Sequence, residues 1–286
     1  MRNKKLTKEE EDKIAELLVS GYSIKEITEK LNLCREVIRR RARLLGIKPF
    51  RGKSHFYKIK DCPNDLKQLI IGSLLGDGTF EKIQENDGNS CLVIAHCKEQ
   101  LEYLNMKYQI LLKHSLVNKI TKSVYTDDRF KNPEYTLFKV KSRRNPIFTY
   151  VRNKCYIEGK KHLFFDIIED IDAMGLAIWY MDDGYVTNNS CILSTCSFTK
   201  EEQLLLSYFL LGRFGLHFTV GKNDNSMYLL SSDFDKFRKI ISPFVLESME
   251  YKLVPYKERV LNKQGELLEQ PTRSISSQAT EEHKSM

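Results

Sequence analysis

The sequence predicts an α+β protein made of two similar halves, preceded by a small all-helical unit at its N-terminus. Three observations carry this prediction: an arginine-rich N-terminal segment with helical periodicity, two apolar runs that each end in aspartate and glycine, and the same order of helices and strands after each run. With 286 residues, the chain is long enough for a full hydrophobic core and for more than one domain.

Composition narrows the class of protein further. The apolar share is 41%, and no apolar run approaches the roughly 20 residues of a membrane span. The charged N-terminus is followed by no apolar segment of a secretory signal, so we expect no membrane partner. Seven cysteines without a C-x-x-C pair favour a reducing compartment and disfavour a zinc framework. We therefore expect a cytoplasmic protein, bacterial or phage-encoded, with an organelle left open.

Basic charge is concentrated at the N-terminus. Residues 1–60 carry 17 Lys/Arg and 8 Asp/Glu, whereas the other 226 residues carry 29 and 30. Residues 1–48 predict three helices, because capping boxes begin at Thr7 and Ser23 and glycines follow at Gly21 and Gly46. The third helix would project charged side chains outward: Arg35, Glu36, Arg39, Arg40 and Arg43.

This arrangement matches a helix-turn-helix DNA-binding domain, whose last helix enters the major groove. A small helical bundle that contacts another protein is the alternative. Residues 49–61 are interpreted as a linker.

From residue 62 onward, helices and strands are mixed. The expected first half, residues 62–160, contains strands at 91–97 and 135–140 and a helix near 98–113. The expected second half, residues 161–262, contains a strand at 191–196, a helix at 199–212, strands at 216–220 and 227–230, and a helix near 232–242. Residues 263–286 are polar and predict a flexible tail.

Two apolar helix-like runs, Leu69–Gly78 and Leu176–Gly184, place Asp77 and Asp183 at their ends, 106 residues apart. A carboxylate is disfavoured at a helix C-terminus unless a cation compensates it. Gly72 lies four residues before Gly76, so both share a face that lets a second helix approach closely. If the two helices pack together, their carboxylates meet and require a divalent cation, for which oxygen ligands favour Mg²⁺.

Each motif alone is typical of a turn, and the pair is far more specific. A second basic run, residues 139–161, could be a solvated surface or a DNA contact. Its candidate DNA-binding residues are Lys139, Lys141, Arg143 and Arg144.

Together these motifs resemble those of the LAGLIDADG homing endonucleases. Ile70–Gly78 and Leu176–Gly184 align with the nine-residue signature, and the second, Leu-Ala-Ile-Trp-Tyr-Met-Asp-Asp-Gly, is similar to that of the monomeric, double-motif branch. Residues 191–202 and Met249-Glu-Tyr-Lys-Leu-Val-Pro255 resemble the same branch. The resemblance covers roughly residues 62–258. The sixth signature position, often acidic in the family, is Leu75 and Met181 here, and the N-terminal helices lie outside the family core.

This resemblance implies a monomer with two pseudo-symmetric αββαββα halves, whose saddle-shaped antiparallel sheets lie along the major groove. The implied activity is site-specific hydrolysis of both strands of double-stranded DNA across the minor groove, leaving short 3′ overhangs. By the same resemblance, Asp77 and Asp183 would bind Mg²⁺ with help from the carbonyls of Gly76 and Asp182. Lys252 and Lys161 would be the catalytic lysines, with the adjacent Lys160 as the alternative to Lys161.

Other functions stay open at this point. A group I intron RNA maturase would use the same scaffold on intron RNA, and a transcription regulator would combine a degenerate core with a DNA-binding head. Both aspartates and Lys252 are present, which favours the nuclease. An intein is disfavoured because no splicing blocks flank the core, and the six histidines form no H-N-H or H-E-x-x-H cluster.

Overall fold

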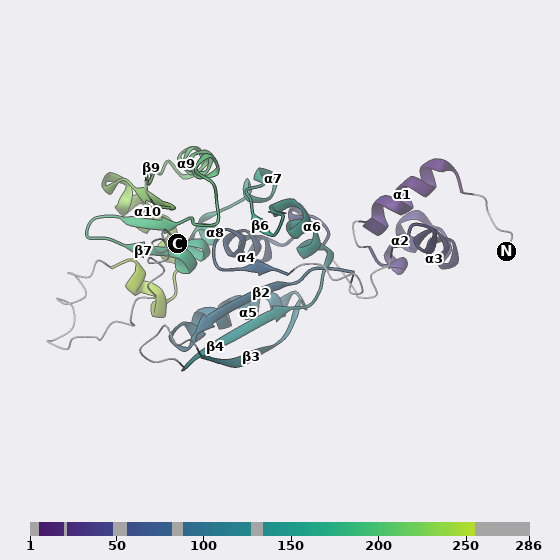
Figure 1. Cartoon of the computed structure of the whole chain (residues 1–286), viewed down its shortest axis with the longest axis horizontal. Helices are drawn as coiled ribbons and strands as arrows, with labels where there is room; N and C mark the ends of the chain where they lie inside the picture. The colour runs from purple at the N-terminus through teal and green to yellow at the C-terminus, as the bar shows by residue number, and fades with distance from the viewer. Residues whose placement is uncertain are drawn as a thin grey trace, which may run out of the picture.

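The computed structural model describes residues 6–19, 22–47, 56–81, 88–126, 134–222 and 224–254. Figure 1 shows the N-terminal helices α1, α2 and α3 beside a larger body of helices and sheets. The expected tail at 263–286, most of the expected linker and the expected stop at Gly21 lie outside the described residues.

The N-terminal unit consists of helices α1 (Lys8–Val19), α2 (Ile24–Leu31) and α3 (Arg35–Leu44). Both predicted capping boxes form: Thr7 and Glu10 exchange hydrogen bonds of 3.0 and 3.1 Å, and Ser23 and Glu26 do the same before α2. A separate small core holds the helices together, with its buried side chains contributed by all three and by the turn before α3: Ile14, Leu17, Leu18, Ile27, Leu33, Ile38 and Ala42.

In the first half, one signature helix is followed by a four-stranded antiparallel sheet in the order β1-β2-β4-β3. Its elements are α4 (Asn64–Leu75), β1 (Thr79–Phe80), β2 (Leu92–Cys97), α5 (Leu101–Lys113), β3 (Val117–Thr126), β4 (Glu134–Ser142) and α6 (Pro146–Cys155). Side chains alternate along each strand, so Val140 is buried while Lys139 and Lys141 lie on the opposite face.

The second half repeats this plan, with sheet order β7-β8-β10-β9. Its elements are α8 (Ala173–Asp183), β7 (Gly184–Val186), β8 (Cys191–Ser194), α9 (Lys200–Phe214), β9 (Phe218–Val220), β10 (Ser226–Leu229) and α10 (Phe234–Ile241). The hairpin of β5 (Tyr156–Ile157) and β6 (Lys160–Lys161) and the short α7 (Phe165–Ile168) connect the halves. Five 3-10 turns complete the described structure: η1 (Ile59–Asp61), η2 (Lys98–Gln100), η3 (Ser231–Asp233), η4 (Ser242–Phe244) and η5 (Glu247–Lys252).

Helices α4 and α8 pack against each other at the centre of the larger body (Figure 1). Gly72 permits this approach, because a Cβ built there would lie 2.7 Å from the carbonyl oxygen of Gly175 and from Ile178. At the other end of the pair, the side-chain amide of Gln68 donates to Asp170 O and its oxygen accepts from Asp172 N. Both helices are buried on nearly every face, which is expected of a pair enclosed between two sheets.

Most of the helices, and the strands β2, β4, β8, β9 and β10, are where the sequence predicts them. The residue patterns gave no range for β1, β3, β7, α6, α7 or the β5–β6 hairpin, although the αββαββα plan implied by the resemblance includes β1, β3, β7 and α6. The expected boundary between residues 160 and 161 falls within β6. Residues 56–61, placed in the linker by the sequence, belong to the larger body: Ile59 is 1% exposed within its core. Among the described helices, none is both long and apolar enough to cross a bilayer.

Candidate active site

Asp77 and Asp183 lie at the adjoining C-terminal ends of α4 and α8. Gly76 ends α4, and Asp183 is the last residue of α8. Asp77 is solvent-accessible and Asp183 is half-buried, but surrounding protein desolvates both carboxyl groups. Desolvation by burial, followed by the negative charges of neighbouring aspartates, raises the pKa of each. The site therefore concentrates negative charge that a bound cation would stabilise.

Two lysines approach this site in equivalent ways. Lys161 Nζ donates to the carbonyl oxygen of Gly76 at 2.7 Å, and Lys252 Nζ donates to that of Asp182 at 3.0 Å. Gly76 and Asp182 each directly precede one of the two aspartates, so the lysines contact matching positions of the two signature helices. Lys252 also donates to Met181 O at 2.5 Å. Lys160, the alternative in the sequence, is exposed, whereas Lys161 is partly buried.

Burial lowers the pKa of both Lys161 and Lys252, while the nearby aspartates oppose that effect. Lys252 is held by a further contact, because the hydroxyl of Tyr180 donates to its carbonyl oxygen at 2.6 Å. Each ammonium is therefore fixed beside a carbonyl and close to the paired carboxylates. This is where a group that orients water or stabilises developing charge would have to lie.

A buried polar cluster that the sequence analysis missed lies directly beneath these residues. The carboxylate of Asp182 is fully buried, and its Oδ1 accepts from Lys107 Nζ at 2.5 Å and from the hydroxyl of Tyr103 at 2.8 Å. Lys107 also donates to Nε2 of His96 at 3.2 Å, and His96 Nδ1 faces Oε1 of Gln100 at 3.1 Å. One signal was readable: Lys107 lies four residues from both Tyr103 and Leu111, on the buried face of α5.

Charge within the cluster is balanced by Lys107 rather than by His96. Burial, followed by the Lys107 charge, lowers the pKa of His96 to about 4, so its ring is neutral at physiological pH. Nε2 then accepts from Lys107, and Nδ1 carries the proton toward Gln100. Ligand atoms of Asp77, His96 and Asp182 lie within 4.8 Å of one another. Because Lys107 already bonds two of these residues, we assign its ammonium as the cation that the Asp182 side chain requires.

The predicted DNA-binding arginines of α3 point away from the N-terminal core. Arg35, Arg39, Arg40 and Arg43 are all exposed. Glu36 pairs with Arg43 at 2.6 Å and with Arg39 at 3.5 Å. Arg41, which lies nearer the packed side, pairs with Glu11 of α1 at 3.1 Å. The four exposed arginines therefore form one accessible basic face.

The predicted basic residues at the end of β4 differ from one another in their contacts. Lys139 Nζ lies 3.5 Å from the hydroxyl of Tyr125, and Arg143 is exposed. Lys141 pairs with Glu81 at 2.8 Å, and Arg144 donates to the carbonyl oxygen of Asn89 at 2.7 Å. Arg144 and Lys141 are therefore partly engaged within the protein.

Comparison with known proteins agrees with this arrangement. The family model described as LAGLIDADG DNA endonuclease family matches residues 67–237. The Cytochrome b mRNA maturase bI2 of Debaryomyces hansenii is 28% identical over 201 residues, which cover 69% of this chain and 76% of that protein. The Probable intron-encoded endonuclease 1 of Wickerhamomyces canadensis is 25% identical over 211 residues, covering 66% of this chain and 83% of the relative. Several other curated relatives are matched over only about half of their length, between 46% and 48%.

Among solved structures, the homing endonuclease I-WcaI bound to its DNA recognition sequence has the same fold, with a TM-score of 0.60. That match covers 74% of this chain and 97% of the other at 20% sequence identity. The family match extends over 171 residues, and the duplicated sheets and packed signature helices agree with it. The chain therefore belongs to the LAGLIDADG DNA endonuclease family.

Proposed function

We propose that this protein is a site-specific endonuclease that hydrolyses both strands of a double-stranded DNA target, with Mg²⁺ as its cofactor. One observation carries the proposal: two matching sets of aspartate, preceding carbonyl and lysine meet where α4 and α8 end side by side. Each set offers the groups needed to hydrolyse one phosphodiester bond. A single chain contains both sets, which is consistent with a monomer acting on two strands.

The donor set suits Mg²⁺. Carboxylate and carbonyl oxygens are its preferred protein ligands, and Asp77, Asp183 and the carbonyls of Gly76 and Asp182 supply four such groups. The raised pKa values of the two aspartates indicate that their negative charges lack sufficient compensation from the protein itself. A bound divalent ion supplies Lewis-acid activation of water and stabilises charge on the phosphate. In our proposal, Lys161 and Lys252 orient the attacking water and stabilise the developing negative charge.

The outer face of the first sheet is the proposed surface for reading DNA. Lys139 and Lys141 lie on it, and Lys139 is paired in register with exposed Thr121 of β3. Exposed Tyr125 and Tyr135 stack beyond them, with ring centroids 5.7 Å apart. Basic, hydroxyl and aromatic groups of this kind can contact both phosphates and base edges in a major groove.

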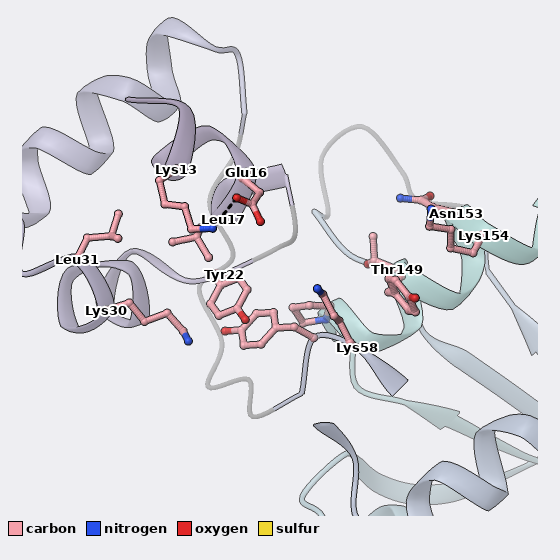
Figure 2. Close-up of a pocket in the computed structure, with 13 residues that line it drawn as sticks. Lys13, Glu16, Leu17, Tyr22, Lys30, Leu31, Lys58, Thr149, Asn153 and Lys154 are labelled. Atoms are coloured by element: carbon pink, nitrogen blue, oxygen red, sulfur yellow. Dashed lines mark hydrogen bonds and ion pairs between the residues drawn. The ribbon is translucent and has the colours of Figure 1, made fainter. Parts of the chain in front are cut away.

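The N-terminal unit is proposed to lengthen the DNA footprint through the exposed arginines of α3. It faces the larger body across a groove of about 640 Å³ (Figure 2). The rings of Tyr22 and Tyr57, which both line this groove, stack on each other. Four lysines line this groove: Lys13, Lys30, Lys58 and Lys154. Glu16 pairs with Lys13 at 2.7 Å. The excess of basic groups favours a DNA backbone that continues from the sheets toward α3.

An RNA maturase is the second candidate, and one specific observation favours it: a relative matched over 76% of its length is named a cytochrome b mRNA maturase. Assistance of RNA folding does not require paired metal-binding aspartates or their lysines. The presence of both complete sets makes DNA cleavage the first proposal, with intron RNA as a possible second partner. A regulator without cleavage activity has less support for the same reason.

The test is a cleavage selection on a random or genomic DNA library with Mg²⁺, using the full chain and the double variant Asp77→Asn/Asp183→Asn. We expect the wild type to make double-strand cuts at a defined site and the double variant to bind that site without cutting it. If no DNA is cut while intron RNA is bound tightly, the endonuclease proposal is wrong and the maturase is favoured.

A further inference from the structure

The side chain of Asp182 occupies the contact between the two signature helices, and the two halves are not equivalent there. The matching position of the first helix is Gly76, where a Cβ would lie 2.6 Å from both Cβ and Oδ2 of Asp182. Contacts this short do not occur between real side chains, so only one of the two positions can carry a side chain in this space. The sequence places it in the second half.

Two residues of the first half, Lys107 and Tyr103, bond this carboxylate, and His96 supports Lys107. Oδ1 of Asp182 accepts from Lys107 and Tyr103, at 2.5 and 2.8 Å, and His96 Nε2 lies 3.7 Å from it. The side chains of Lys107 and Asp182 are both 0% exposed. A buried pair of charges tolerates little displacement, because each group loses its compensation when the other moves. Asp182 is therefore fixed in orientation by α5 and β2.

The other carboxylate oxygen contacts the active site. Oδ2 of Asp182 accepts from the backbone N–H of Asp77 at 3.3 Å. On the preceding residue, the carbonyl oxygen of Gly76 accepts from Lys161. The peptide segment that carries the Asp77 carboxylate is thus held from the opposite half on one side and by Lys161 on the other.

We propose that Asp182 is a positioning residue that acts through its side chain on Asp77, with Lys107 fixing its orientation. The proposal rests on the endonuclease function proposed above. Because Gly76 has no side chain, Asp183 lacks the corresponding contact. Loss of the Asp182 carboxylate should therefore slow cleavage of the strand assigned to Asp77 more than cleavage of the strand assigned to Asp183.

Two double variants distinguish a role of Asp182 in positioning Asp77 from an effect on the stability of the fold alone. Lys107→Met/Asp182→Leu removes the charge pair and every side-chain acceptor at position 182, while a similar side-chain shape fills the space. Lys107→Met/Asp182→Asn also removes the charges, but its amide can turn so that its oxygen accepts from Asp77 N–H. Tyr103 keeps an acceptor in both, because its hydroxyl also lies 2.9 Å from Ile178 O and can donate its single proton there. Lys113→Met is the control: Lys113 lies on the same helix as Lys107, and its loss breaks only an exposed pair with Asp65 of α4.

The experiment uses the full chain, a duplex target labelled separately on each strand, thermal unfolding, and hydrogen exchange of peptides that cover residues 76–80. We expect both double variants to unfold close to the wild-type temperature. In the leucine variant, the ratio of the cleavage rate of the Asp77 strand to that of the Asp183 strand should be at least tenfold lower than in the wild type. The amides of residues 76–80 should also lose protection from hydrogen exchange. The asparagine variant should keep the wild-type ratio of the two rates and the wild-type protection.

Equal behaviour of the two double variants in both the strand ratio and the exchange would overturn the positioning role. Should the wild type cut no DNA, the proposed function fails by itself. Hydrogen exchange still decides whether Asp182 holds the Asp77 peptide, since it requires no cleavage. A leucine variant with wild-type protection at 76–80 would then contradict the inference directly.

Discussion

The two aspartates of the candidate active site carry an electrostatic cost that depends on pH. Burial and the charges of Asp77 and Asp182 raise the pKa of Asp183 to about 7, whereas an unfolded aspartate titrates near 4. A raised carboxyl pKa contributes stability that is fully present below about pH 4 and is lost as pH rises through about 7. Metal-free protein should thus be less stable above neutral pH.

In EDTA, the unfolding temperature of the wild type should fall between pH 5 and pH 8 by more than that of Asp183→Asn. Mg²⁺ should raise the unfolding temperature more at pH 8 than at pH 5.5, because protons compete with the metal for the carboxylates. Calorimetry at both pH values measures this effect. A Mg²⁺ effect that is equal at the two pH values would contradict a site built on these aspartates.

Adjacent lysines at 160 and 161 give a matched comparison at the residue scale. Lys161 bonds the carbonyl of Gly76, whereas Lys160 is exposed. Lys161→Met should reduce the cleavage rate of one strand by about 10²- to 10³-fold, the usual effect of losing one group that stabilises a transition state. Lys160→Met should change it by less than about threefold. Strand-resolved single-turnover kinetics test this, and equal losses in both variants would refute the assignment.

At the scale of elements, the close packing of α4 on α8 determines whether the two sites meet. Gly72→Ala would place a Cβ 2.7 Å from the backbone oxygen of Gly175, which cannot move as a flexible side chain does. We expect a loss of about 1–3 kcal/mol in the free energy of unfolding, with cleavage of both strands reduced. Gly212→Ala in α9 is the control.

No atom lies within 4 Å of a Cβ built at Gly212, and this glycine lies within a helix. Alanine there should therefore raise the free energy of unfolding by up to about 1 kcal/mol. Chemical denaturation of both variants measures the difference. If Gly72→Ala were as stable as Gly212→Ala, the packing of the signature helices would have to be looser than described.

The sequence predicted those elements whose signals lie within a short stretch of residues. Capping boxes and apolar periodicity located α1, α2, α5 and α9, because those signals are local. Strands β1 and β7 have only two and three residues, too few for an alternating pattern to be recognised. Helix α6 begins with a cap at Asn145 and with Pro146, but the sequence analysis considered this segment only as part of the basic run 139–161, a solvated surface or a DNA contact.

For the candidate site, the sequence predicted the aspartates from the motif and the lysines from the resemblance. It could not identify the cluster of His96, Tyr103, Lys107 and Asp182, because these residues are up to 86 positions apart and meet only through the fold. A lysine on an apolar helix face was the one local sign of it. The choice between Lys160 and Lys161 likewise depended on which side of a two-residue strand faces the site.

For the whole molecule, we expect the N-terminal unit to add affinity for DNA without taking part in hydrolysis. The variant Arg35→Ala/Arg40→Ala should weaken binding of the target and reduce the slope of log affinity against log salt by about 2, because each lost phosphate contact contributes about 1. Cleavage at saturating protein should be unchanged. Lys239→Ala, an exposed lysine of α10, is the control. An unchanged salt slope in the arginine variant would exclude α3 from the DNA contact.

The central claim is that one chain holds two active sites, one for each strand, centred on Asp77 and Asp183. Strand-resolved cleavage by the single variants Asp77→Asn and Asp183→Asn, on a target selected with the wild type and in the presence of Mg²⁺, tests it most directly. We predict that each variant cuts one strand much more slowly than the other, that the slow strand differs between the two variants, and that the double variant cuts neither. Cleavage of both strands by the double variant, or loss of the same strand in both single variants, would contradict the claim.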